Sequence, residues 1–319
     1  MSFCSFTVPL RRFLLGSLSL TLVGCLEIEE KFTLNPDGSG KFAVTQILNM
    51  KQLPDAKIAS VEELVSDTVK QTKGVDVWAE ATGKVRPDGR WEMKLQGYFK
   101  DFSGLKFLPL HPKSILGGLV AGDNGKSPVD LIDMKVNDSG VHPASRDLLS
   151  LALVTLKLNP GKESPRTTPA PPVNPKFQAS VNQSKPFLAG CKVTTFFNFG
   201  EGEVTNVETF TCVNAHTVKI ETDFGYMAEH GVTAMTAFKG PTADLRESDI
   251  ITYANCAFPA GKDAKGIPSV VVKPKGPAFP YEIESAKAKA SQSLALKKLL
   301  EGASAKLEEA KAKALEGKK

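Results

Sequence analysis

Apolar and polar residues alternate over 26–34, and this alternation predicts a β-strand with one buried face. Leu26, Ile28, Phe32 and Leu34 share the apolar face, whereas Glu27, Glu29, Lys31 and Thr33 lie on the other. Turn-forming residues follow at 35–40, and a second alternating stretch covers 42–48. Because Asp-Gly at 37–38 is a preferred hairpin turn, the two stretches predict a β-hairpin.

A change from strand to helical spacing predicts one helix after this hairpin. Apolar residues recur at helical spacing over 55–72, at Ile58, Val61, Leu64, Val65 and Val69. Two further alternating stretches, 75–81 and 91–99, flank a second Pro-Asp-Gly turn at 87–89. Residues 26–100 therefore predict a ββαββ unit, an antiparallel sheet with a helix on its apolar face.

The rest of the chain predicts a second β-rich part and a C-terminal helix. Repeated prolines over 160–176 have little to bury and predict a linker. Alternating stretches at 191–199, 204–213 and 217–222 then predict strands. From residue 282 onward Ala, Lys, Leu and Glu dominate at helical spacing, which predicts one long helix. The expected fold class is α+β, with domains at 25–159 and 177–280 and the Ala/Lys-rich helix at 281–319.

The first 25 residues have the pattern of an export signal. Arg11 and Arg12 precede an apolar stretch at 13–23, which is too short to span a bilayer as a helix. Leu22-Val23-Gly24-Cys25 resembles the bacterial lipobox. That resemblance implies cleavage between Gly24 and Cys25, removal of residues 1–24, and attachment of palmitate-type acyl chains to the Cys25 thiol. The alternative is an ordinary secretory signal with a cysteine at this position by chance.

A lipid on Cys25 implies an envelope protein held on the extracytoplasmic side of a membrane. Leu26 after the lipid site permits the outer membrane if the bacterium is Gram-negative. Membrane lipid is therefore the first expected partner. The domain that follows resembles that of LppM-like lipoproteins, through Cys25, the alternation over Leu26–Leu34 and the sequence Asp37-Gly38-Ser39-Gly40. This resemblance implies an envelope protein of poorly defined activity and supplies no catalytic residues.

Composition and cysteine content narrow the function further. The chain is 41% hydrophobic with a formal net charge of +5, which is too mild to indicate nucleic-acid binding. Cys4 would be lost with the signal. Cys191 and Cys212 lie on stretches expected to be neighbouring strands, so they form a candidate disulfide that leaves Cys256 as a thiol. Other pairings and three reduced thiols are the alternatives.

No motif of a catalytic, metal or cofactor site stands out. The chain has no CxxC, no HExxH, no GxSxG and no phosphate-binding P-loop. Asn35, Asp37 and Ser39 match the start of a calcium loop, but Gln46 occupies the position that needs Glu, so a hairpin turn is the better interpretation. Glu229-His230 beside Tyr226 is the nearest approach to an acid-base pair, but a surface loop is the better interpretation. We therefore expect no catalytic residue, no metal site and no cofactor.

These patterns favour a non-catalytic interaction or scaffold module on a lipid anchor. A protein partner docking on the C-terminal helix is one expectation. The other expectations for this helix are that it packs on its own protein or that it contacts an anionic membrane surface. The alternatives from other classes are a lipid-anchored hydrolase with its site in the second half and a solute-binding lipoprotein. The many predicted hairpins count against the last, because solute-binding proteins alternate strands and helices.

Overall fold

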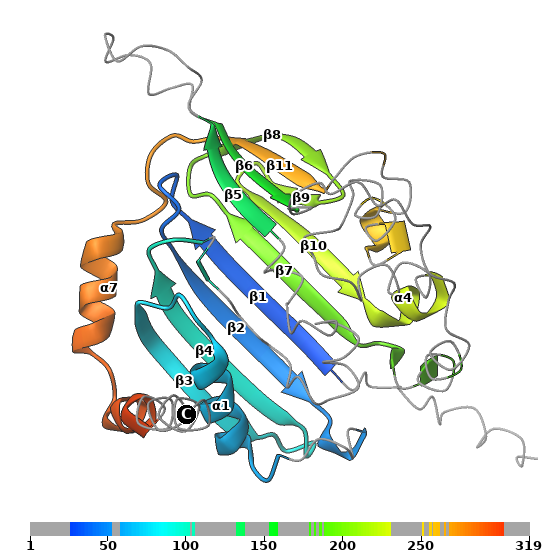
Figure 1. Cartoon of the computed structure of the whole chain (residues 1–319), viewed down its shortest axis with the longest axis vertical. Helices are drawn as coiled ribbons and strands as arrows, with labels where there is room; N and C mark the ends of the chain where they lie inside the picture. The colour runs from blue at the N-terminus through cyan, green and yellow to red at the C-terminus, as the bar shows by residue number, and fades with distance from the viewer. Residues whose placement is uncertain are drawn as a thin grey trace, which may run out of the picture.

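The fold is a mixed α+β arrangement of two sheets with helices beside them (Figure 1). It is seen in a computed structural model. The structure describes residues 26–52, 58–102, 104–105, 132–137, 153–158, 179, 182, 185–186, 188–230, 251, 255–256, 258–261, 265 and 268–302. The predicted α+β class is confirmed. The export signal, Cys25 and the predicted linker at 160–176 lie outside the described residues.

The larger sheet has seven strands in the order β3-β4-β2-β1-β7-β10-β9. Their bounds are β1 Leu26–Leu34, β2 Gly40–Leu48, β3 Val77–Val85, β4 Trp91–Phe99, β7 Lys192–Asn198, β9 Thr211–Asn214 and β10 Thr217–Asp223. Neighbouring strands are antiparallel except β1 and β7, which pair in parallel. We call this the central sheet.

The smaller sheet has four antiparallel strands in the order β5-β6-β11-β8. Their bounds are β5 Ile132–Asn137, β6 Leu153–Leu158, β8 Glu203–Glu208 and β11 Ser269–Lys273. This sheet lies near the β1–β2 turn (Figure 1). Short 3-10 turns occur at Met50–Gln52 (η1) and Pro259–Gly261 (η6).

The parallel pairing of β1 with β7 joins two parts of the chain that the sequence pattern treats separately. Phe32 on β1 and Phe197 on β7 are register partners, and their rings stack with centroids 5.5 Å apart. Both side chains are fully buried. This contact lies in an aromatic cluster that also contains Phe42, Phe99 and Phe102. The core of the central sheet is therefore continuous across the β1–β7 pair.

Helix α1, Val61–Gln71, packs on β3 and β4 through the predicted apolar stripe. It begins later than the expected Asp55, because Ser60 caps it: Ser60 Oγ accepts a hydrogen bond from the Glu63 backbone N–H at 3.2 Å. Glu63 Oε2 accepts from the Ala59 N–H at 2.8 Å, which satisfies a second donor before the helix. The apolar period alone extends further than the hydrogen-bonded helix does.

Within the residues that the structure describes, the predicted uninterrupted C-terminal helix is broken at residues 291–293. Helix α7, Tyr281–Ala290, ends where the Ser291 N–H donates to the Lys287 carbonyl, and a second helix covers 294–302. Ser293 Oγ caps the second helix by accepting from the Leu296 N–H at 3.1 Å. Between them, Gln292 Nε2 donates to the Trp78 carbonyl at 2.7 Å. Ser291, Ser293 and the hydrogen bond from Gln292 to Trp78 therefore interrupt the helix, although the surrounding residues have high helix propensity.

Candidate functional site

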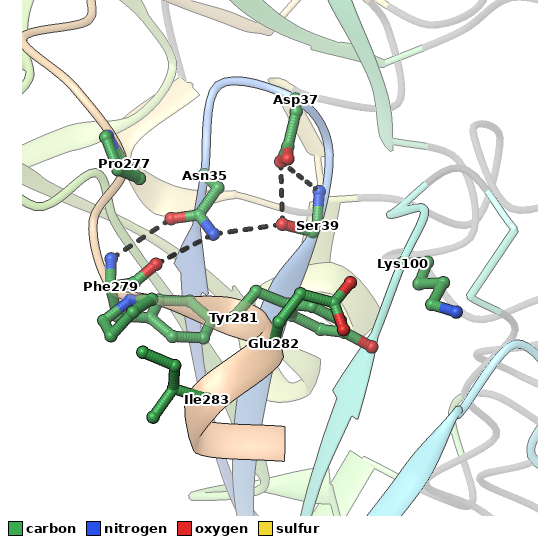
Figure 2. A pocket seen from close by; sticks show the side chains of 10 residues that line it. Asn35, Asp37, Ser39, Lys100, Pro277, Phe279, Tyr281, Glu282 and Ile283 are labelled. Carbon is green, nitrogen blue, oxygen red and sulfur yellow. Dashed lines mark hydrogen bonds between the residues drawn. The ribbon is translucent and has the colours of Figure 1, made fainter. Parts of the chain in front are cut away.

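The β1–β2 turn holds a distant part of the chain through one buried side chain. Asn35, only 3% exposed, accepts hydrogen bonds through Oδ1 from the Ala278 N–H at 2.7 Å and the Phe279 N–H at 3.2 Å. Its Nδ2 donates to the Phe279 carbonyl at 3.2 Å and to Ser39 Oγ at 3.0 Å. Figure 2 shows Asn35 between Ser39 and the backbone of Phe279. Both donors and both acceptors of this amide are used, and we call the arrangement the Asn35 latch.

The latch follows from the hairpin chemistry expected at 35–40. The Gly38 N–H donates to the Asn35 carbonyl at 3.1 Å, and Gly38 adopts a φ of 89°, which glycine tolerates best. Asp37 Oδ1 accepts from both the N–H and the Oγ of Ser39, at 2.9 and 2.7 Å. The hydrogen bonds of Asn35, Asp37 and Ser39 are thus those of a hairpin turn, as expected from the sequence. Within the described residues, no group of three His, Cys, Asp or Glu side chains could hold a metal ion.

Aromatic rings continue the attachment from the latch to α7. Tyr98, Phe279 and Tyr281 lie with ring centroids 6.3 Å apart, and Lys41 Nζ lies 4.6 Å from the Phe279 ring centroid while bonding Glu284 Oε2 at 2.8 Å. The Tyr281 hydroxyl donates to Asp76 Oδ2 at 2.6 Å. The pKa of Tyr281 is raised, mainly because the side chain is buried and secondly because its hydroxyl donates to Asp76.

An open hollow of about 590 Å³ lies between the turn and the start of α7 (Figure 2). Its walls include the Asn35 latch, the rings of Phe279 and Tyr281, and the exposed side chain of Ile283. Lys100 and Glu282 supply charges at its edge. The Asn35 amide and the hydroxyls of Ser39 and Tyr281 already form hydrogen bonds within the protein. These wall groups therefore join one segment of the chain to another.

A second hollow, of about 580 Å³, lies on the open face of the central sheet. Ile47 and Phe196 form its apolar part, and charged side chains from β1, β7 and β10 surround them. Lys192 bonds Glu221 Oε1 at 3.2 Å and Asp223 Oδ2 at 3.4 Å. The hydrogen bond to Glu221 is the main cause that raises the pKa of Lys192. This face begins at Glu27, two residues after Cys25.

The candidate disulfide between Cys191 and Cys212 is wrong. The three cysteines of the described residues are not joined in disulfides. Strand β10 lies between β7 and β9, and its Val218 pairs with Cys212 on one side and with Phe197 on the other. Cys212 is therefore level with Phe197, which lies six residues beyond Cys191 in the chain. The two Cα atoms are thus separated by roughly 20 Å, far beyond the roughly 7 Å that a disulfide permits. Cys191 is buried, Cys212 exposed and Cys256 half-buried.

Tyr226, Glu229 and His230 lie on a helix, where a surface loop was expected. His230 stacks on Tyr226 with ring centroids 4.3 Å apart, and its Nδ1 lies 3.0 Å from the Tyr226 carbonyl at the end of helix α4, Phe224–His230. The Tyr226 hydroxyl donates to the Asn255 carbonyl at 3.0 Å. These bonds attach α4 to the body, and the absence of a catalytic residue stays a prediction.

A buried carboxylate is the polar feature that the sequence reasoning missed. Glu30 is 0% exposed and accepts a hydrogen bond from Thr195 Oγ1 at 2.6 Å. Gln46, 1% exposed, lies diagonally across the β1–β2 pair on the same face. The signal was present, because position 30 falls between Ile28 and Phe32 on the apolar face of β1.

The two sheets and the helices beside them define the chain as a mixed α+β protein. No protein-family model matches it, and no curated protein matches it in sequence. A match among solved structures is the folded domain of the LppM protein of Mycobacterium tuberculosis, determined by NMR. It has 11% identity, covers 63% of this chain and 84% of that one, and has a TM-score of 0.26. A similarity this low carries no argument about function.

Proposed function

We propose that this chain is a lipid-anchored protein of a bacterial envelope that serves as a non-catalytic interaction module. Residues 1–24 would be removed and acyl chains on Cys25 would hold the body at the extracytoplasmic side of a membrane. Each buried CH₂ group of an acyl chain contributes about 0.8 kcal/mol, and two or more chains give stable anchoring. None of the helices among the described residues has the length and apolar character needed to cross a bilayer.

The observation that carries the proposal is the position of Leu26. This residue follows the lipobox-like sequence directly and is the first residue of β1, where it is 0% exposed and pairs with Leu48. Since β1 lies in the middle of the central sheet, the proposed lipid would be attached to a rigid strand with no linker between them. The anchor would therefore fix the position of the body as well as its location.

The interaction part of the proposal rests on exposed apolar side chains near the C-terminus. Ile283 in α7 is 56% exposed and Leu294, in the second helix, is 69% exposed. A protein partner that docks on these helices would bury both side chains. Substituting each with Ser, in the acylated protein, should weaken partner cross-linking in membranes while leaving the fold intact. A Lys289→Ser variant, which changes an exposed polar position of α7, is the matched control.

Metabolic labelling with an alkyne fatty acid tests the anchor. The wild type should incorporate the label, and Cys25→Ala should lose it and retain the leader. Cys212→Ser is the matched control, because it removes an exposed cysteine elsewhere and should leave labelling unchanged. An unlabelled wild type, or a Cys25→Ala variant labelled as strongly as the wild type, would refute the proposal.

A further inference from the structure

Four apolar residues form one row across the central sheet, level with the start of β1. Leu26 pairs with Leu48, Leu48 pairs with Trp91, and Trp91 pairs with Val85. Because register partners lie side by side, this row runs perpendicular to the strands and ends at the β3 edge. It begins one residue after Cys25.

The far end of this row is open to solvent. Leu26 and Leu48 are 0% and 4% exposed, but Val85 is 59% exposed. Val85 leads into the β3–β4 turn at 86–90, where Pro87 is also exposed. The Gly89 N–H donates to the Arg86 carbonyl at 2.9 Å, so the turn is a closed, hydrogen-bonded tip. A turn that exposes Val85 and Pro87 among charged side chains thus lies about 14 Å sideways from the proposed tether, at three strand spacings.

We propose that Val85 and Pro87 form a second membrane contact, in which this tip rests among phospholipid headgroups. The inference rests on the proposed acylation of Cys25. Two contacts at one end of the sheet hold the strands upright on the bilayer. Strand β1 spans nine residues, or about 30 Å, so the Asn35 latch and the smaller sheet would lie that far from the membrane.

The charges around the tip favour an apolar contact over an electrostatic one. Arg90 pairs with Glu27 at 2.7 Å and with Asp88 at 2.9 Å. Arg86 lies 3.8 Å from both Asp88 and Glu92, and Lys84 pairs with Glu92 at 3.2 Å. Lys94 also lies 3.7 Å from Glu92, so four basic side chains face three acidic ones. A nearly neutral tip with exposed Val and Pro fits a zwitterionic phosphatidylcholine surface and predicts little dependence on salt.

Fluorescence quenching in vesicles tests this contact. The full acylated protein would carry Cys212→Ser and a bimane probe at either Val85→Cys or Lys100→Cys. Lys100 follows the end of β4 directly, nine residues beyond Trp91, so it is the matched distant site. Both variants should keep the urea midpoint of the parent, because both positions are exposed. The vesicles contain phosphatidylcholine with a headgroup spin label, and flotation first establishes that the protein is bound.

The Val85 probe should lose about half of its emission or more at low and high salt, because a contacting probe lies within about 10 Å of the headgroups. The Lys100 probe should keep its emission. Bound protein with an unquenched Val85 probe, or with equal quenching at both sites, would overturn the upright contact. Quenching that requires anionic lipid would overturn its apolar character. If the wild type fails to float with vesicles while Cys25→Ala behaves identically, the proposed lipid anchor fails instead.

Discussion

Replacing Asn35 with Ala should destabilise the protein far more than one exposed hydrogen bond would. The substitution removes all four hydrogen bonds of the latch and leaves the Ala278 N–H, the Phe279 N–H and the Phe279 carbonyl without their partner. Ser39 Oγ keeps its bond to Asp37. The segment that α7 follows would therefore lose its polar attachment to β1 and β2.

The magnitude follows from burial. A buried polar group left without a partner costs about 1–3 kcal/mol, whereas a group that water reaches costs little. Phe279 is 6% exposed, so its N–H and carbonyl are the costly groups, and the bond from Ala278 is only partly buried. The free energy of unfolding should fall by about 2–4 kcal/mol, a large part of the 5–15 kcal/mol typical of a domain.

Urea unfolding followed by tryptophan fluorescence measures this change, and hydrogen exchange locates it. The amide protons of Ala278 and Phe279 should exchange faster in Asn35→Ala than in the wild type. Asn214→Ala is the matched control, because Asn214 makes one exposed turn bond, to the His216 N–H at 2.8 Å, and its loss should cost about 0.5–1 kcal/mol. Equal midpoints for the two variants, with unchanged exchange at 278–279, would refute the reasoning.

Three other predictions test separate parts of the structure. Tyr281→Phe should lower stability at pH 8 by about 1.5–3 kcal/mol, since a bond to the Asp76 carboxylate is lost. Because the folded pKa of Tyr281 lies above its ordinary 10.0, its contribution is complete below that pH and is lost as pH rises beyond it, so urea midpoints of wild type and variant should converge at high pH. Gly40→Ala should cost about 1–3 kcal/mol by overpacking, because its Cβ would lie 2.7 Å from a backbone oxygen of β1. A maleimide at pH 8 should modify exposed Cys212 quickly and Cys256 slowly, since burial raises the pKa of the Cys256 thiol.

Each of these three predictions has a result that would contradict it. Parallel pH profiles for Tyr281→Phe and wild type would mean that the hydroxyl titrates as it does in the unfolded chain. An unchanged urea midpoint for Gly40→Ala would mean that β1 and β2 accommodate a methyl group. Equal labelling rates for Cys212 and Cys256, read by peptide mass spectrometry, would contradict the difference in burial.

Local patterns in the sequence determined the elements of the N-terminal half. Alternation over 26–34 requires an extended chain with one buried face, and Asp37-Gly38 supplies the positive φ of the turn. The helical stripe beginning at Val61 sets the face of α1 that packs on the sheet. Such features depend on residues within a few positions of one another, so the sequence specifies them without knowledge of the rest.

The tertiary structure alone decided how distant segments meet. Three features depend on how segments far apart in sequence are placed side by side. They are the pairing of β1 with β7, the position of β10 between Cys191 and Cys212, and the backbone groups that Asn35 bonds. Period-two alternation fixes which face of a strand is buried, but it is the same for every partner and for parallel or antiparallel pairing. The partner is selected by packing of the whole core, here by Phe32 against Phe197, and that selection requires both strands in space.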